Sequence, residues 1–417
     1  MDIKPRCYDK IVQLINKGVD IPNPLTLDLG DEVNVDRISG NGVRIYPGCR
    51  IYGEETVISA GAQIGYEGPV TIDNCQLGPK VELKGGYFNT SVFLEKANMG
   101  LGAQVREASI LEEEAGGAHC VGLKQTILFP FVTLGSLINF CDCFMAGGTS
   151  RKDHSEVGSS YIHFNYTPDG DKATASLIGD VPRGVMLNQP AIFLGGQGGM
   201  VGPVHMGYGN VVAAGSILRS DFPENNKLII GKIHSPKKIN FTPWAYTNLH
   251  RIVGDNILYL ANLMALEAWY THVRRPFFDA QEFGLLVYEG VLDKLALAKK
   301  ERVKRLQILA EKAKLYSEND SEKKRDLAGR KEFHEKFSEI EELFSGSIQR
   351  NAVEKEREDF LSSFDQIKGK QNTNYIEAIQ GLPRHLSGKG TLWLQGIVDA
   401  FCDKAKLILP LFNMFGK

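Results

Sequence analysis

The sequence predicts a parallel β-helix in the N-terminal half of the chain and an α-helical domain in the C-terminal half. The first observation is a six-residue rhythm of aliphatic residues, kept without error at Met206, Val212 and Leu218. An amphipathic helix would repeat at about 3.6 residues and a hairpin strand at about 2, so this period indicates stacked short strands. The second is that most of the 44 glycines lie in residues 40–220, where tight corners favour glycine. The third is a change of character after residue 245, where Lys, Glu, Arg and Ala become common.

Residues 1–32 are expected to form an N-terminal cap. They hold a short amphipathic helix at 8–17, followed by a proline turn. The end coil of a solenoid exposes open strand edges and an apolar end face, which such a cap would cover. The β-helix itself is predicted over residues 33–221. It is interrupted by long loops at 147–156 and 165–174, and loops on a rigid scaffold are where function concentrates.

Residues 222–245, with several prolines and a lysine cluster, are predicted to be a linker, and residues 246–417 an α-helical domain. Apolar residues at helical spacing run through 297–342 among many charges, which favours an antiparallel helical hairpin over a coiled coil that recruits a partner. The stretch 392–415 is apolar but is interrupted by charged residues and a proline. We expect a core or oligomer-contact helix there rather than a membrane-associated one.

The charge balance and the cysteines narrow the functional classes. With 48 basic and 50 acidic residues the formal net charge is −2, so no global field favours nucleic acid or an anionic membrane. No apolar run reaches about 18 residues, so no transmembrane segment is predicted. The seven cysteines are an odd number without CxxC spacing and no signal segment leads the chain, which predicts reduced thiols in the cytoplasm. Cys141, Asp142 and Cys143 could ligate a metal, but alternating strand positions point to opposite faces, so no metal site is predicted.

The densest polar cluster of the β-helical half lies between Asp142 and Lys172. Its histidines suit general-base chemistry, its lysines and arginines suit anionic oxygens such as phosphate, and its asparagine can orient a sugar hydroxyl. His163 alternates with two apolar neighbours, so we expect it on the outer surface of the solenoid, lining a groove. His154 follows a basic turn on a predicted loop, where it is either a base or ligand or an exposed histidine without a task.

A series of short motifs follows in order along the coils: Glu156-Val157-Gly158, Asn165-Tyr166, Asp169-Gly170, Ile178-Gly179-Asp180, Val201 to Gly207 and Val212 to Gly215. This series resembles the C-terminal domain of the family of bifunctional N-acetylglucosamine-1-phosphate uridyltransferases and glucosamine-1-phosphate acetyltransferases. The resemblance extends over residues 40–220, most firmly over 156–221, and leaves the helical half without a counterpart. It implies a left-handed β-helix, a homotrimer, and acetyl-CoA or another acyl-CoA bound in a groove between neighbouring subunits.

The same resemblance assigns roles to individual residues. The family's sugar-binding asparagine-tyrosine pair and the lysine that follows it fall on Asn165, Tyr166 and Lys172. Small residues would let a pantetheine arm lie against the backbone of the coils. By the resemblance, the acyl-CoA groove would run past Ser159, Gly196 and Ala214.

The sequence departs from the family at its catalytic positions. The family's catalytic histidine falls at or near Asp142, and its phosphate-binding arginine and lysine fall near Ser109 and in 128–130, where neither charge occurs. The nearest basic substitutes are Arg106, Arg151, Lys152 and His154. No Rossmann-like segment precedes the coils and the family's glycine-rich nucleotide loop is missing, so we do not expect nucleotidyltransferase activity.

We therefore expect an acyl-CoA-dependent acyltransferase acting on an amino sugar, a sugar phosphate or a nucleotide sugar of UDP-N-acetylglucosamine and cell-envelope precursor metabolism. The acceptor amine would lose its proton to His163 or His154, with Asp142 as an orienting or substitute carboxylate, while backbone N–H groups stabilise the oxyanion. Arg151 would join the sugar-binding residues. The alternative is a nucleotide-sugar-binding or trimeric scaffold protein that has lost the chemistry. The missing phosphate ligands favour that alternative, and the retained sugar-binding residues oppose it.

Overall fold

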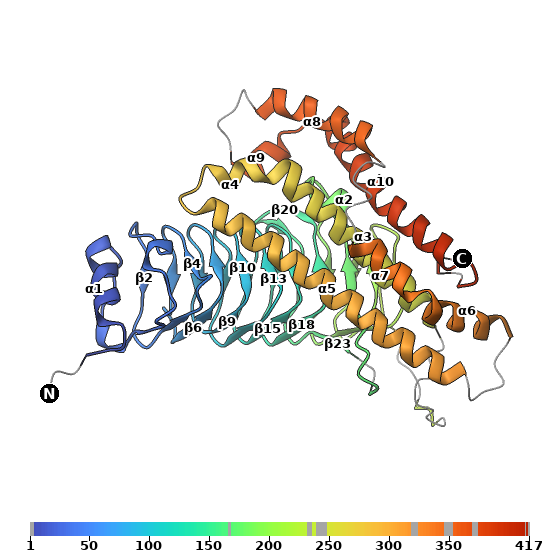
Figure 1. Ribbon diagram of the computed structural model, residues 1–417, viewed down its shortest axis with the longest axis horizontal. Helices are drawn as coiled ribbons and strands as arrows, with labels where there is room; N and C mark the ends of the chain where they lie inside the picture. The colour runs from blue at the N-terminus through green and yellow to red at the C-terminus, as the bar shows by residue number, and fades with distance from the viewer. Residues whose placement is uncertain are drawn as a thin grey trace.

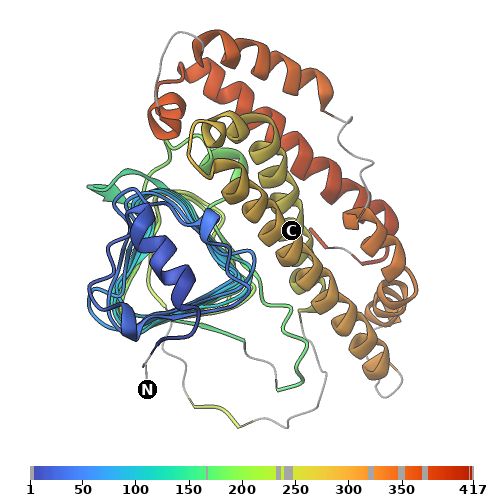
Figure 2. The ribbon, with the colours of Figure 1, turned by 60° about the vertical axis from the view of Figure 1, so that its left-hand side comes forward.

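The computed structural model describes residues 4–165, 168–231, 236–238, 248–317, 324–345, 353–368, 374–412 and 414–415 (Figure 1). A parallel β-solenoid forms the N-terminal half, and a group of helices lies along one side of it (Figure 1). Both halves of the predicted fold are therefore confirmed. Viewed from its N-terminal end, the solenoid is a triangular prism with one sheet on each side (Figure 2).

The chain visits three parallel sheets in turn, which we call A, B and C. Sheet A has the order β2 (Arg44–Ile45), β5 (Gln63–Ile64), β8 (Glu82–Leu83), β11 (Asn98–Met99), β14 (Gly116–Gly117), β17 (Thr133–Leu134), β22 (Glu156–Val157), β25 (Phe193–Leu194), β28 (Val211–Val212) and β30 (Leu228–Ile229). Sheet B has the order β1 (Asp28–Leu29), β3 (Arg50–Tyr52), β6 (Val70–Asp73), β9 (Gly86–Asn89), β12 (Ala103–Val105), β15 (Val121–Lys124), β18 (Ile138–Cys141), β23 (Ile162–Phe164), β26 (Gly199–Val201) and β29 (Ile217–Leu218). Sheet C has the order β4 (Val57–Ile58), β7 (Gln76–Leu77), β10 (Ser91–Phe93), β13 (Ser109–Leu111), β16 (Ile127–Leu128), β19 (Cys143–Met145), β24 (Ser176–Ile178) and β27 (His205–Met206).

The six-residue rhythm has the structural cause that the sequence suggested. Met206, Val212 and Leu218 belong to three successive sides of the prism, and all three are buried inside it. One inward apolar side chain per strand fills the interior, and burying a residue of this size contributes about 1.5–3 kcal/mol. The turns between sheets define three corners, A–B, B–C and C–A. At the B–C corner the chain turns through a left-handed residue such as Gln125 (φ 53°) or Asp142 (φ 56°) in successive coils.

The ends of the solenoid extend slightly beyond the limits 33–221 expected for it. Strand β1 lies in the stretch expected to be the cap, and β30 lies in the stretch expected to be the linker. Helix α1 (Tyr8–Lys17) lies across the N-terminal end of the prism, with Ile11 and Leu14 buried (Figure 2). An antiparallel hairpin, β20 (Gly148–Ser150) with β21 (Asp153–His154), and the short helix α2 (Val181–Gly184) interrupt the later coils.

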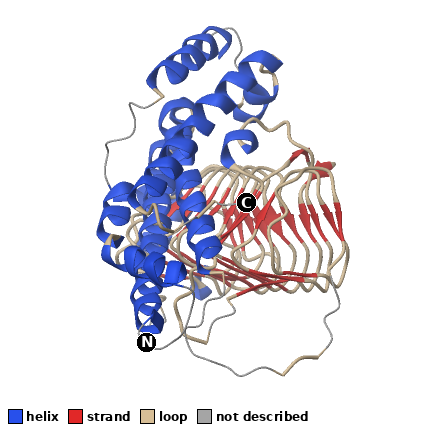
Figure 3. Ribbon diagram, turned by 90° about the vertical axis from the view of Figure 1, so that its right-hand side faces the viewer, coloured by secondary structure: helices blue, strands red, loops and turns tan. Residues whose placement is uncertain are grey.

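The helical half begins with α3 (Leu249–Trp269), a turn of π-helix at Tyr270–Arg274 and α4 (Arg275–Asp279). It continues through α5 (Gly284–Ser317), α6 (Lys324–Glu335), α7 (Phe337–Ser345), α8 (Glu354–Lys368), α9 (Tyr375–Gln380) and α10 (Arg384–Ile408). Helix α5 packs along sheet C on β7, β10 and β13, and α3 packs on β24 of the same sheet. The helices therefore cover one side of the prism, as the side view shows (Figure 3). Among the parts of the chain that the structure describes, no helix combines the length and the apolar character needed to cross a membrane.

Candidate functional site

The residues expected to form a site divide among the three corners of the prism. Asp142, Asn165 and Lys172 lie at the B–C corner or on the loop that follows it, since they connect sheet B to sheet C. The small residues lie at the A–B corner, and the hairpin with His154 lies at the C–A corner. Tyr166 lies outside the described residues. The B–C corner is therefore where the structure brings most of the predicted polar residues together.

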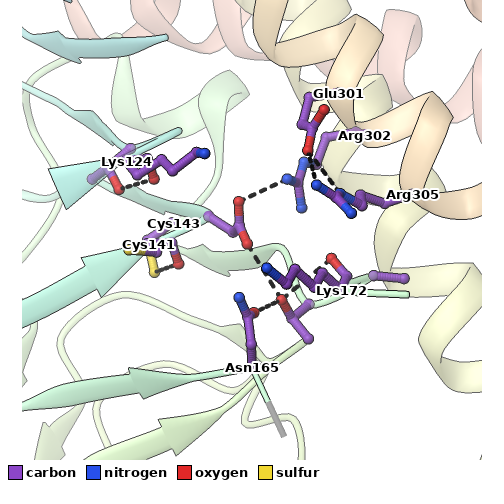
Figure 4. Close-up of polar contacts among 12 residues, drawn as sticks. Lys124, Cys141, Cys143, Asn165, Lys172, Glu301, Arg302 and Arg305 are labelled. Carbon is purple, nitrogen blue, oxygen red and sulfur yellow. Dashed lines mark hydrogen bonds and ion pairs between the residues drawn. The ribbon is translucent and has the colours of Figure 1, made fainter. Parts of the chain in front are cut away.

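Asp142 occupies the B–C corner with its carboxylate buried against the helical half. Its Oδ1 atom accepts a hydrogen bond from Nη2 of Arg302 on α5 at 2.7 Å (Figure 4). The two side chains are 8% and 3% exposed. Breaking such a buried pair by removing one partner leaves an uncompensated charge, which costs about 3–5 kcal/mol. The position to which the resemblance assigns a catalytic histidine thus carries a carboxylate that is engaged by the helical half.

Thr174 connects Asp142 to Asn165. Its hydroxyl lies 3.4 Å from Oδ2 of Asp142 and donates a short hydrogen bond to Oδ1 of Asn165 (Figure 4). The carbonyl of Lys172, two residues earlier, lies 3.5 Å from the same hydroxyl, while the Lys172 side chain is exposed. Asp142, Asn165 and Lys172 are therefore neighbours, with a buried carboxylate behind a more exposed amide and ammonium group.

His163 lies inside the solenoid, so the expectation that it lines an outer groove is wrong. Its residue is 4% exposed, its Nε2 atom lies 2.8 Å from Oγ of Ser176, and Phe140 meets its ring edge to face. It pairs in register with the buried Met200, while its neighbour Ile162 takes the outward position. Burial lowers the pKa of His163 to about 4, with the Asp142 carboxylate opposing this and the Arg302 charge adding to it. His163 is therefore a neutral, enclosed imidazole near neutral pH.

Arg151 and His154 form the turn and end of the β20–β21 hairpin at the C–A corner. Nη1 of Arg151 donates to the carbonyls of Glu114 and Phe131 and to Oγ1 of Thr133, at 3.0, 3.1 and 2.9 Å. Nδ1 of His154 lies 3.0 Å from the Arg151 carbonyl. Arg151 thus holds the hairpin against the preceding coils of the solenoid. Within one chain, neither residue belongs to the group around Asn165.

Ser159, Gly196 and Ala214 lie in successive coils at the A–B corner, where backbones approach closely. A Cβ atom on Gly196 would come within 2.8 Å of the Ser159 carbonyl oxygen. A Cβ atom on the preceding Gly195 would come within 2.4 Å of the Ala214 nitrogen. The corner therefore excludes larger side chains and forms a column of small residues. Strand β23 separates Ser159 from Asn165, so the two sets of predicted residues occupy adjacent corners of the same coil.

The cysteines beside Asp142 do not lie on one strand, as the sequence reading assumed: Cys141 ends β18 in sheet B and Cys143 begins β19 in sheet C. Sγ of Cys141 donates to Oδ1 of Asn139 at 3.2 Å, while Cys143 is fully buried and burial raises its pKa. Throughout the described ranges, no three His, Cys, Asp or Glu side chains are placed to share a metal ion.

Sequence reasoning missed the contribution of the helical half. The pattern of residues 297–342 does not set Arg302 apart from the other charged residues there, yet Arg302 lies on the buried stripe that also contains Leu295, Ala298, Leu306 and Leu309. These residues recur every three or four positions, so an arginine in phase with them signals a buried partner. That signal is present in the sequence, but it does not say which surface holds the partner.

A second buried charge network joins the two halves at the C–A corner. Arg274, in the π-helical turn, lies 3.2 Å from Oε2 of Glu112 and makes a short contact to Glu113. Its guanidinium also lies over the ring of Tyr375, 3.8 Å from the centroid. Burial raises the pKa of Glu112 to about 7, and the neighbouring Glu113 carboxylate raises it further. The charge of Arg274 and a hydrogen bond from Tyr270 lower this pKa. One arginine thus serves two carboxylates in a closed space.

No protein-family model matches the chain. The chain is similar to the bifunctional protein GlmU of Thermotoga maritima, with 27% identity over 215 residues, which is 51% of this chain and 42% of the relative. The bifunctional protein GlmU of Staphylococcus haemolyticus is 27% identical over 215 residues, and that of Fervidobacterium nodosum 27% over 229 residues, covering 42% and 44% of those relatives. The chain thus spans less than half the length of these curated relatives. This likeness and the parallel solenoid together fit a left-handed β-helix in about half of the chain.

Proposed function

We propose that the protein is an acyl-CoA-dependent acyltransferase that acts on an amino sugar, a sugar phosphate or a nucleotide sugar. The observation that supports this most is that Asp142, Asn165 and Lys172 are neighbours at one corner, while the adjacent corner of the same coil carries the small-residue column. Both corners lie in the solenoid, and the solenoid half of the chain is the half that is similar to GlmU proteins.

The acceptor would bind at the B–C corner. The exposed Lys172 ammonium group provides a charge for an anionic oxygen, such as a sugar phosphate. Asn165 offers amide hydrogen-bonding groups to a sugar hydroxyl or acetamido group, and Tyr166 would complete the set. Arg151 joins the acceptor site only if a neighbouring subunit brings its hairpin to this corner, because within one chain it is held at the C–A corner.

The acyl donor, acetyl-CoA or another acyl-CoA, would lie along the small-residue column of Ser159, Gly196 and Ala214. By the resemblance, a homotrimer would place this column in a groove between neighbouring subunits. Backbone N–H groups of the coils would stabilise the oxyanion as the acceptor amine attacks the thioester carbonyl and the thiolate leaves.

His154 is the histidine that we propose as general base. Its side chain is 21% exposed, so it can exchange a proton with an acceptor amine, whereas His163 is enclosed and Asp142 is already paired with Arg302. Glu156, whose Oε2 atom lies 4.0 Å from Nε2 of His154, would stabilise the imidazolium once it has taken the proton. His163 and Asp142 would then support the acceptor site from behind.

The ion pair of Asp142 with Arg302 also favours a second candidate, a non-catalytic nucleotide-sugar-binding or trimeric scaffold protein. It places a neutralised carboxylate at the position to which the resemblance assigns the catalytic histidine. Such a protein would keep the acceptor-binding residues without the proton acceptor.

Thiol release from acetyl-CoA, measured across amino sugars, their 1-phosphates and their nucleotide forms, separates the two candidates. For an enzyme, we expect His154→Gln to lower turnover about 10²–10⁴-fold with coenzyme A binding retained. Lys172→Ala should mainly weaken a phosphate-bearing acceptor, since it removes a charged contact and not the base. The enzyme is excluded if every acceptor fails while a nucleotide sugar still binds, and the scaffold then remains.

A further inference from the structure

Two helices of the helical half hold the short segment that carries the acceptor residues. Arg302 of α5 binds Asp142, which lies beside Thr174. Independently, Nδ2 of Asn256 on α3 donates to the carbonyl of Ala173 at 3.0 Å. Both residues, Arg302 and Asn256, are almost fully buried. The segment directly after Lys172 is thus fixed from outside the solenoid at two adjacent residues.

The contacts from Arg302 continue to the amide of Asn165. Arg302 holds Oδ1 of Asp142, and the single hydrogen of the Thr174 hydroxyl is shared between two acceptors, Oδ2 of Asp142 at 3.4 Å and the nearer Oδ1 of Asn165. With its oxygen already accepting from Thr174, Asn165 keeps its Nδ2 group to donate, so a ligand with a hydrogen-bond acceptor suits it. A sugar hydroxyl, an acetamido carbonyl and a phosphate oxygen all satisfy this condition.

We propose that Arg302 is a positioning residue of the acceptor site, and that the helical half is therefore part of the site that binds the sugar. This inference rests on the proposed function of the B–C corner. Arg302 acts through Asp142 and Thr174 and does not touch the acceptor. It accounts for a buried arginine on the apolar stripe of α5, where an aliphatic residue would pack without the cost of desolvating a charge.

The first test needs no ligand. Hydrogen exchange of residues 171–178 should become faster in Arg302→Gln, because the carboxylate that anchors Thr174 loses its partner. Arg305→Gln is the matched control, since Arg305 lies one turn along α5 and its ion pair is with Glu301 of the same helix. Equal exchange in the two variants would overturn the link between Arg302 and this segment.

The second test measures binding by calorimetry with glucosamine 1-phosphate and UDP-N-acetylglucosamine, and with acetyl-CoA as the internal reference. We expect Arg302→Gln to lower the affinity for the acceptor about tenfold or more, with the affinity for acetyl-CoA unchanged. Arg302→Lys should restore part of the lost affinity. The double variant Arg302→Gln/Asp142→Asn removes both charges and so avoids an unpaired buried carboxylate, and it should bind acceptor as weakly as the single variant.

The outcomes distinguish the inference from the function on which it rests. Wild-type acceptor affinity in a folded double variant would overturn the positioning role and leave the proposed function intact. If the wild-type protein binds neither acceptor, the assignment of the corner to sugar binding is wrong, and the role of Arg302 in that binding is wrong with it. A parallel loss of acceptor and acetyl-CoA affinity would show that Arg302 supports only the fold.

Discussion

Burial decides the chemistry of His163. The imidazole lies among the inward side chains of the solenoid, beside Phe140 and Met200, and its one described side-chain hydrogen bond joins it to Ser176. The Ser176 hydroxyl also accepts from the Val204 amide at 3.0 Å, so His163 is tied to the backbone of the next coil. A histidine in this position links coils and remains neutral, and a charge on it would be costly.

The burial of His163 predicts how the free energy of unfolding depends on pH. The pKa of His163 falls from its ordinary 6.5 to about 4 in the folded protein, so its contribution to stability is fully present above pH 6.5 and is lost as the pH falls toward 4. We expect His163→Gln to reduce the difference in unfolding free energy between pH 7 and pH 4.5 by about 2–3 kcal/mol. Urea unfolding at the two pH values measures this, with His154→Gln as the control. An unchanged difference in His163→Gln would contradict the buried, neutral state.

For Glu112 we expect the opposite dependence of stability on pH. Its folded pKa of about 7 lies above the ordinary 4.5, so the folded protein holds the proton more tightly. The contribution to stability is fully present below pH 4.5 and is lost as the pH rises through 7. Unfolding free energies at pH 5 and pH 8 should therefore differ less in Glu112→Gln than in the wild type. Glu95→Gln, a change of an acidic residue at the solenoid surface, is the control, and an equal reduction in both variants would argue against Glu112 as the titrating group.

The sequence grouped Asn165, Lys172 and Asp142 better than it oriented His163. The three were expected in one polar cluster, and they are neighbours because the B–C corners of two successive coils stack on each other. His163 was assigned to the wrong face, because its apolar neighbours Ile162 and Phe164 were taken as the inward residues. The six-residue step from the buried Val157 reaches His163 without an insertion, and the in-register pairing of His163 with Met200 agrees with this inward position.

Among the elements, α5 (Gly284–Ser317) covers much of the outer face of sheet C and so leaves the faces of sheets A and B exposed. It runs along sheet C, so its apolar stripe and the outer face of that sheet cover each other. The helical character of this stretch was predictable from its spacing. The surface that it covers was not, because a buried stripe shows that a helix has a partner without identifying it. The antiparallel return through α6, which packs on α5, agrees with the expected helical hairpin.

The small-residue column at the A–B corner predicts a steric test for the acyl donor. Ala214 is exposed and lies against the glycine backbone of the previous coil, so Ala214→Trp should fill the space that a pantetheine arm would use. Coenzyme A should raise the melting temperature of the wild type, because a ligand that binds the folded state stabilises it by mass action, and this shift should disappear in the variant. Leu392→Trp, at an exposed position on α10, should keep the shift. A shift that survives Ala214→Trp would place the donor elsewhere.

At the scale of the whole molecule, the two sides of the prism that meet at the A–B corner carry exposed apolar side chains. Phe193, Val211 and Leu228 form one row across sheet A, with Phe193 in register with Val211 and Val211 with Leu228. Ile162 and Ile217 are exposed on sheet B. Neighbouring apolar residues on adjacent strands are typical of an interaction surface. Since helices already cover sheet C, a second copy of the chain would meet the solenoid here.

For the homotrimer that the resemblance implies, we expect a closed ring through sheets A and B, with the helices outside. Light scattering after size exclusion should give about three times the chain mass of 46.1 kDa for the wild type. Replacing Phe193 and Val211 together by glutamate would bury six charges in the ring, two per subunit, and should leave a folded monomer, whereas Leu392→Glu on the distant α10 should leave the trimer intact. The same double variant should lose thiol release and keep its helical content, because a site shared between subunits cannot form in a monomer. A wild-type monomer at micromolar concentration would exclude both the ring and a site shared between subunits, and the two corners of one chain would then have to act alone.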